Sequence, residues 1–296
     1  MIVSKYPEKA AKSLPLFDHF DYLYLYVHVD QRHEFQDELD KLKLNARIVV
    51  HGHERVGGKT PMGALRHHPM RLLQAWMQAS DLAVVSDDDV EPGKIRLADG
   101  TRREFAPGSE CRCSLCPGYR FLTIDSGAFA GEVASLAAEA RNGGFPYFTG
   151  SFNGQAHGPY RPYRVFRAQT SWSGMFGFFK DSPNVFDPAF PLGADYAAQA
   201  QLIAQTHRKA VLAHTGLLMD YGINTAAYDA PAENRRENLE RLVAQYANFA
   251  RRGREAVGLY RLTENTKTSR HTGAVSLKIP REVSNLLKRN VDERYR

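Results

Sequence analysis

Cysteine is scarce in this chain of 296 residues, which holds only three, all between residues 111 and 116. An odd, clustered set of cysteines does not make a disulfide framework. No apolar run approaches the ~18 residues of a membrane-spanning helix. The first residues match neither a secretory signal, which is basic and then apolar, nor an arginine-rich transit peptide. These absences predict a cytoplasmic protein with no membrane partner.

Positive charge is concentrated at one end of the chain. The formal net charge is +6, but residues 251–296 hold twelve Lys and Arg against five Asp and Glu. That segment therefore has a net charge of +7, which leaves −1 for residues 1–250. A localised basic extension favours a polyanionic partner, nucleic acid first and an anionic surface second. The alternative is a solvated tail whose charge serves solubility.

The first ninety residues alternate between strand and helix patterns. In chain order these are strands at 1–4, 21–29, 46–51 and 82–86, and helices at 31–42 and 70–79. Further strands are predicted at 121–125, 211–219 and 274–280, and helices at 132–141, 195–209 and from 229 onward. Strands separated by helices at this rhythm indicate parallel βαβ units. The prediction is an α/β fold over residues 1–250, with a mostly parallel central sheet flanked by helices.

Residues 97–119 interrupt this rhythm and are predicted to form an insertion. They combine three Gly-containing turns with Cys111, Cys113 and Cys116. Thiolates at such short spacing suit a soft metal, most simply Zn²⁺ with a fourth ligand from a His or a carboxylate. Reduced free thiols are the alternative, because the cluster is incomplete.

An acidic triplet, Asp87-Asp88-Asp89, ends the apolar strand at 82–86. Alternate strand residues share a face, so Asp87 and Asp89 are expected to point the same way and Asp88 the opposite way. Two carboxylates at a strand end make a hard-oxygen site suited to Mg²⁺ or Mn²⁺ carrying phosphates. An acidic turn after a surface strand is the other interpretation, although α/β folds bind their ligands where strands end.

This layout resembles the GT-A glycosyltransferases, with an N-terminal strand and turn, alternating helices, and a strand that ends in acids near residue 90. Downstream, Pro191–Tyr196 precedes an amphipathic helix where many such enzymes carry Glu-Asp; here Ala194 replaces the first acid and Asp195 remains. The resemblance covers residues 1–225. Within this superfamily the layout is most similar to the TET-associated glycosyltransferases, proposed to glycosylate hydroxymethylated pyrimidines in DNA.

The resemblance implies a nucleotide-sugar donor, most simply a UDP-sugar, whose diphosphate is held by Mn²⁺ or Mg²⁺ on Asp87 and Asp89. Ser4 and Lys5 match the turn that meets the base and ribose, and Asp88 would contact ribose or brace a backbone turn. Arg66 would reach a phosphate, or lie on the surface beside two histidines.

Asp195 is the candidate general base, because sugar transfer requires removal of a proton from the acceptor hydroxyl. An N-cap for the following helix is the alternative role for this residue. Trp172 could stack on the acceptor or lie in the core.

A late histidine is expected to complete the metal site, and His271 is favoured over His214 or the pair at 51 and 53. His271 lies in a polar segment that could close over the diphosphate together with Lys267 and Arg270.

Sugar transfer from a nucleotide-sugar, with a hydroxymethylated pyrimidine in DNA as acceptor, is therefore the predicted activity. The enzyme alternative is a nucleotidyltransferase acting on a sugar phosphate, which also needs paired acids and a metal. Its usual Gly-rich basic loop is poorly matched by Ser4-Lys5-Tyr6-Pro7. The non-enzymatic alternative is a zinc-stabilised DNA-binding protein in which the acids are structural.

Overall fold

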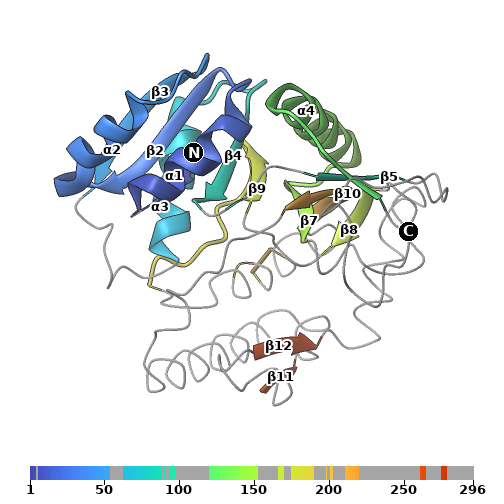
Figure 1. Cartoon of the computed structure of the whole chain (residues 1–296). Coiled ribbons are helices and arrows are strands. Elements are labelled where there is room, and N and C mark those ends of the chain that lie inside the picture. Colours follow the sequence, from blue (N-terminus) through green and yellow to red (C-terminus); the bar gives the residue numbers. More distant parts are fainter. Residues whose placement is uncertain are drawn as a thin grey trace.

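A large mixed sheet organises the chain (Figure 1). The computed structural model describes residues 1–4, 6–53, 63–88, 90, 94–97, 120–152, 166–169, 175–189, 198, 201–202, 211–219, 261–264 and 275–278. The helices are α1 (Pro7–Ser13), α2 (Arg32–Leu39), α3 (Ala64–Trp76) and α4 (Ser126–Gly143), with 3-10 turns η1 (Leu14–Phe17) and η2 (Val29–Gln31). The strands are β1 (Ile2–Val3), β2 (Tyr22–His28), β3 (Arg47–His53), β4 (Leu82–Asp87), β5 (Lys94–Leu97), β6 (Arg120–Thr123), β7 (Tyr147–Phe152), β8 (Phe166–Gln169), β9 (Met175–Phe179), β10 (Val211–Met219), β11 (Arg261–Glu264) and β12 (Val275–Lys278).

The sheet has ten strands in the order β3-β2-β1-β4-β9-β7-β10-β5-β6, with β8 paired to β10. Strands β3, β2, β1 and β4 are mutually parallel, β9 runs against them, and β7 and β10 resume the first direction. Following the pairings outward, seven strands share one direction and β5, β8 and β9 oppose it. The α/β fold with a mostly parallel sheet flanked by helices, predicted from the sequence, is therefore confirmed.

Strand order reverses between β1 and β4, in the middle of the parallel half. The chain leaves β1 for β2 and then β3 on one side, and returns through α3 to β4 on the other side of β1. In open α/β sheets, ligands bind in the crevice outside the carboxyl ends of the strands at such a reversal. Asp87, the last residue of β4, and Asp88 after it lie at that place.

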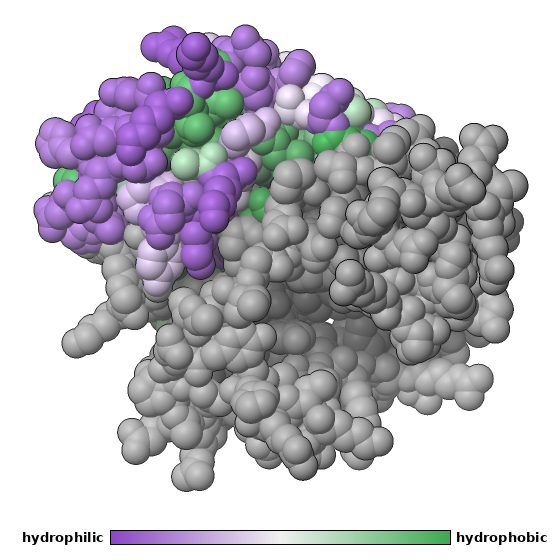
Figure 2. Space-filling model, in the orientation of Figure 1, coloured by the Kyte–Doolittle hydropathy of each residue, from purple (hydrophilic) through white to green (hydrophobic). Residues whose placement is uncertain are grey.

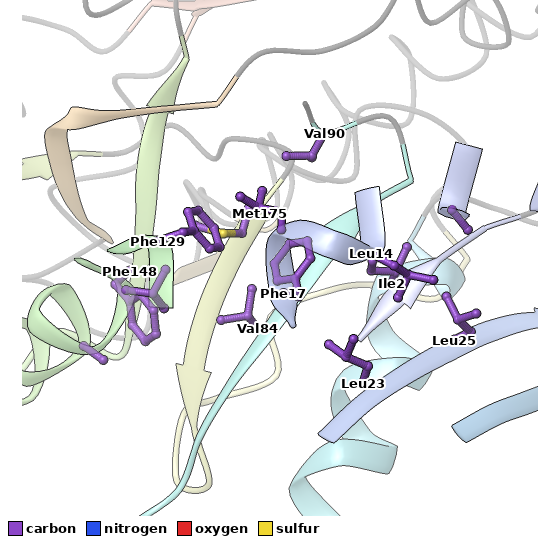
Figure 3. Close-up of a cluster of buried hydrophobic side chains, with 14 of the residues drawn as sticks. Ile2, Leu14, Phe17, Leu23, Leu25, Val84, Val90, Phe129, Phe148 and Met175 are labelled. Carbon is purple, nitrogen blue, oxygen red and sulfur yellow. The ribbon is translucent and has the colours of Figure 1, made fainter. Parts of the chain in front are cut away.

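Side chains of β2 show how the two sheet faces differ. Leu23, Leu25 and Val27 join the core beneath α1, η1 and α2, where Phe35 and Leu39 of α2 are also buried. Figure 3 shows this core continuing past Phe17 and Val84 to Phe129 of α4, and Phe17 meets Phe129 edge to face with ring centroids 5.4 Å apart. The outer surface of α1 and α2 is mainly hydrophilic (Figure 2). The layer on this face is therefore amphipathic, as packed helices require.

The opposite face carries α3. Trp76 near its C-terminal end meets the Tyr24 ring of β2 at 5.0 Å, and the Tyr147 hydroxyl of β7 lies 3.3 Å from the sulfur of Met70. The helix begins six residues earlier than the sequence predicted and contains Pro69. Among the described residues, no helix is both long and apolar enough to cross a membrane.

Several sequence expectations need correction. The short helix α1 was not predicted, and α4 is longer than residues 132–141 because Asp125 caps it by accepting from the Ala128 amide at 2.7 Å. The density of Gly, Pro and aromatic residues in 143–193 predicts short strands and loops that wall a pocket; the segment supplies strands, but two of them, β7 and β9, lie in the centre of the sheet. The strand expected at 274–280 exists as β12, but it pairs with β11 in a separate two-stranded sheet and adds no edge to the main one.

Candidate functional site

Two neighbouring strand ends place Ser4 beside Asp88. In the ladder between β1 and β4, Val3 is opposite Asp87, so Ser4 and Asp88 each follow their strand by one residue. The Ser4 hydroxyl donates to Oδ2 of Asp88 at 2.6 Å. The Ser4 amide in turn donates to the carbonyl of Tyr26 in β2 at 3.1 Å. The three strand ends are thus joined at the reversal of strand order.

Asp87 and Asp88 point to opposite faces of the sheet, as the strand alternation predicted. Asp87 lies on the α3 face, where the guanidinium of Arg66 donates to its Oδ1 and forms an ion pair. Arg66 is 13% exposed and Asp87 27% exposed, so the pair is only partly screened by water. A carboxylate and a guanidinium are therefore held together at the carboxyl end of β4.

Contacts with the segment after β9 fix the beginning of α3. The His67 Nδ1 lies 2.7 Å from the carbonyl oxygen of Phe186, which makes it the donor. The Asn184 side-chain amide donates to the His67 carbonyl at 3.1 Å. These bonds hold the helical turn that presents Arg66 to Asp87.

Asp88 is anchored on the α1 face. Burial raises the pKa of its carboxyl, the Ser4 hydrogen bond opposes that rise, and the neighbouring charge of Asp87 adds to it. The Ser4 hydroxyl engages the Asp88 carboxylate and so links the end of β1 to the turn after β4. Both roles that the sequence suggested for Asp88, bracing a backbone turn and contacting ribose, stay predictions.

Ser13, at the last position of α1, is a site residue that the sequence analysis missed. Its hydroxyl lies 2.8 Å from the carbonyl oxygen of Asp88 and 3.0 Å from that of Val90, and its side chain is 1% exposed. A hydroxyl has one proton, so the two carbonyls share it. Ser13 therefore holds the backbone on both sides of Asp89. No local sequence signal reveals this, because the partners are 75 and 77 residues away.

The described part of the chain shows no preassembled metal site, because no group of three or more His, Cys, Asp or Glu side chains in that part is placed to hold an ion. Carboxylate oxygen is the right donor chemistry for Mg²⁺ or Mn²⁺. The Arg66 guanidinium donates to Oδ1 of Asp87, but a carboxylate has a second oxygen and accepts more than one bond. A divalent ion on Asp87 would need further ligands from other residues, from a substrate or from water.

Most of the other predicted site residues lie outside the described residues, and their roles stay predictions. They are Lys5, Asp89, Cys111, Cys113, Cys116, Trp172, Asp195, Lys267, Arg270 and His271.

Two of the alternative histidines are located by the sheet. His214 lies in β10 opposite Gly150 of β7. His51 shares a cross-strand row with Asp87 through Tyr26 and Val3, three strand spacings away, which is roughly 14 Å at about 4.8 Å per strand. His51 is therefore too far from Asp87 to share an ion with it.

Comparisons with known proteins add little to this geometry. The chain matches no protein-family model and no curated protein. Among solved structures, it is similar to the crystal structure of a protein named as a nucleotide-diphospho-sugar transferase from Desulfovibrio desulfuricans G20. The identity is 16% and the TM-score 0.36, over 85% of this chain and 95% of that chain. A likeness this remote leaves both fold and activity to be argued from the chain itself.

Proposed function

We propose that this protein transfers a sugar from a nucleotide-sugar, with the donor diphosphate in the crevice between β1 and β4. The observation that carries the proposal is the partly exposed Asp87–Arg66 pair at the carboxyl end of β4, where strand order reverses. The Arg66 guanidinium suits a diphosphate, and the Asp87 carboxylate suits the divalent cation that accompanies it. A guanidinium binds phosphate oxygens in a two-pronged geometry, and a carboxylate binds the divalent cation that accompanies them.

The other residues receive the roles that the sequence predicts for them. Ser4 and Asp88 join the ends of β1 and β4, and Lys5, the residue after Ser4, would contact the nucleotide. Asp87 and Asp89, with His271 as a further ligand, would hold Mn²⁺ or Mg²⁺, and the bound ion would supply Lewis-acid stabilisation of the departing nucleoside diphosphate. Asp195 removes the proton of the acceptor hydroxyl. Lys267 and Arg270 add positive charge near the diphosphate.

The acceptor in this proposal is a hydroxymethylated pyrimidine in DNA, and the donor a UDP-sugar. The supporting feature is the basic extension, residues 251–296, whose net charge of +7 contrasts with −1 for the rest of the chain. A polyanionic acceptor gains from such a segment through release of counterions. A structural Zn²⁺ on Cys111, Cys113 and Cys116 would stabilise the insertion at 97–119.

Thermal stability in the presence of Mn²⁺ and a panel of nucleotides tests the donor site. One nucleoside diphosphate at ~100 times its dissociation constant should stabilise the wild type by roughly 2.7 kcal/mol, which is several degrees. Asp87→Asn should abolish the Mn²⁺-dependent part of that shift. Asp37→Asn, an exposed position on α2, is the matched control and should behave as wild type.

Two outcomes would change the proposal. Stabilisation by nucleoside triphosphates alone would indicate nucleotidyl transfer, in which the metal serves attack at phosphorus. No response to any nucleotide, in protein shown to be folded by its unfolding transition, would remove the case for a transferase.

A further inference from the structure

We propose that the exposed rings of Tyr22 and Trp76, the half-buried ring of Tyr24 between them and the side chain of Arg47 form an aromatic platform that binds single-stranded nucleic acid by base stacking. The platform lies on the α3 face of β2 and β3, apart from the donor crevice. It stands independently of sugar transfer, because binding is measured without any donor.

The three rings form a continuous series. Tyr22 and Tyr24 are stacked with centroids 6.2 Å apart and planes inclined by 25°, and Tyr24 meets Trp76 at 5.0 Å. Trp76 then contacts the His51 ring edge to face at 6.1 Å. Strand alternation sets the first pair and the C-terminal end of α3 supplies the indole. The arrangement is therefore held by secondary structure.

Exposure distinguishes this face from the opposite one. Tyr22 is 53% exposed and Trp76 43% exposed, whereas Leu23 and Leu25 on the other face of the same strand are buried. Among the described residues, the large hydrophobic side chains that are this exposed are Tyr22, Trp76 and Val29. Two of the three thus belong to one ring series, and adjoining exposed aromatics mark binding surfaces more often than isolated ones do.

Charge favours a polyanion as the occupant. Arg47 is opposite Tyr22 in the β2–β3 ladder, and its charge acts on the Tyr24 hydroxyl. The paired positions on this face are Tyr22, Tyr24 and Tyr26 on β2 and Arg47, Val49 and His51 on β3, with no carboxylate among them. Flexible single strands of nucleic acid bind to surfaces that combine aromatic rings with a cation. Each base stacks its flat face on a ring, and each phosphate attracts the cation.

Other occupants suit the platform less well. A neutral glycan could stack on the rings but would gain nothing from Arg47. A second copy of the chain would, in a two-fold contact, bring two Arg47 side chains into one small patch. Single-stranded nucleic acid uses both the rings and the guanidinium.

The platform is well separated from Asp87. Tyr26, Val3 and Asp87 occupy one cross-strand row, and Tyr22 lies four residues before Tyr26. At about 3.3 Å per residue and 4.8 Å per strand, Tyr22 is roughly 13 Å along the strands and 10 Å across them from Asp87. The platform is therefore a surface separate from the Asp87–Arg66 pair.

Tryptophan fluorescence tests the platform directly, because the chain has two tryptophans. In a Trp172→Phe background, emission comes from Trp76 alone, and titration with a 20-nucleotide oligothymidylate should quench it. Tyr22→Ala should weaken binding by about five-fold to 100-fold, as loss of one base stack does. Tyr22→Phe, which keeps the ring, should restore it. Arg47→Gln should reduce the slope of log affinity against log salt by about 0.7.

Two control variants and three contrary outcomes complete the test of the platform. Val29→Ala, exposed in η2 just beyond the other end of β2, and Asp37→Asn, exposed on α2, should bind as the Trp172→Phe parent does. Quenching by a neutral hexasaccharide but not by the oligonucleotide would overturn the proposal in favour of a glycan site. A change in Trp76 emission with protein concentration, together with dimers in sedimentation, would assign the platform to self-association. Unchanged emission in folded protein would also overturn it.

Discussion

Ser13 shows how one buried hydroxyl can control an acidic turn. Ser13→Ala leaves the carbonyls of Asp88 and Val90 without their shared donor, which should cost about 1–3 kcal/mol of unfolding free energy. Denaturant unfolding measures this loss. Ser80→Ala, in an exposed loop, should cost under about 0.5 kcal/mol.

Ser13→Ala also tests whether Ser13 positions the backbone around Asp89 for ligand binding or only stabilises the fold. If Ser13 sets the backbone around Asp89, Ser13→Ala should weaken Mn²⁺-dependent nucleotide binding even at temperatures where the variant is fully folded. Equal affinity in folded Ser13→Ala and wild type would show that the turn is held without this hydroxyl.

His51 gives the fold a defined response to pH. Burial, and then the charge of Arg32, lower the pKa of His51 below its ordinary value of 6.5. The unfolded chain therefore binds a proton more readily than the folded one, so this residue makes stability fall as pH drops through 6.5 toward the lowered pKa. His51→Gln should flatten that part of the stability profile. Urea unfolding between pH 5.5 and 7.5 checks it; an unchanged slope would exclude His51 as the source.

At the residue scale, the sequence predicted what depends on strand period and missed what depends on distant partners. Asp87 and Asp88 point to opposite faces because strand side chains alternate, and that follows from the apolar run before them. The contacts of Asp87 with Arg66 and of Asp88 with Ser4 and Ser13 join elements 21 to 84 residues apart. Such contacts can be predicted only when the order of the strands in the sheet is known.

The contact between β7 and β9 requires a glycine. A Cβ added at Gly177 would overlap the ring of Phe148, which is fully buried in the neighbouring strand. Gly177→Ala should therefore destabilise the protein by about 1–3 kcal/mol through overpacking. Gly131→Ala, in α4 with nothing within 4 Å of the added Cβ, should instead stabilise it by about 0.5–1 kcal/mol. Thermal or denaturant unfolding of the two variants compares them, and equal effects would contradict the close packing at Gly177.

At the element scale, periodicity located most strands, but element ends followed other rules. α3 begins at Ala64, six residues before the predicted start, and accommodates Pro69. Helix ends depend on caps and on tertiary bonds, such as the one between His67 and the Phe186 carbonyl. β9 is an antiparallel strand between β4 and β7. Its five buried residues, Met175–Phe179, show no alternation, so the sequence could not distinguish this strand from pocket-lining loops.

At the scale of the whole molecule, opposite ends of the sheet and of the chain carry different chemistry. The proposed donor site lies at the carboxyl ends of β1 and β4, and the proposed aromatic platform lies near the amino end of β2. Net charge is divided along the chain as well, with +7 in residues 251–296 and −1 before them. Rings can supply stacking on one strand of nucleic acid while a basic segment supplies phosphate contacts, and only the second contribution depends strongly on salt.

Salt dependence therefore tests the role of the basic extension in the intact protein. Neutralising Arg251, Arg252 and Arg254 together with glutamine should lower the slope of log affinity for duplex DNA against log salt by up to about 2.7, at about 0.9 per phosphate contact. Neutralising the exposed Lys12, Lys41 and Lys43 removes the same formal charge from the first 250 residues and should leave the slope unchanged. Fluorescence anisotropy of a labelled duplex between 50 and 200 mM salt provides the measurement. Equal slopes of log affinity against log salt for the two triple variants would mean that net charge alone governs binding. The basic extension would then not be a specific DNA-binding segment.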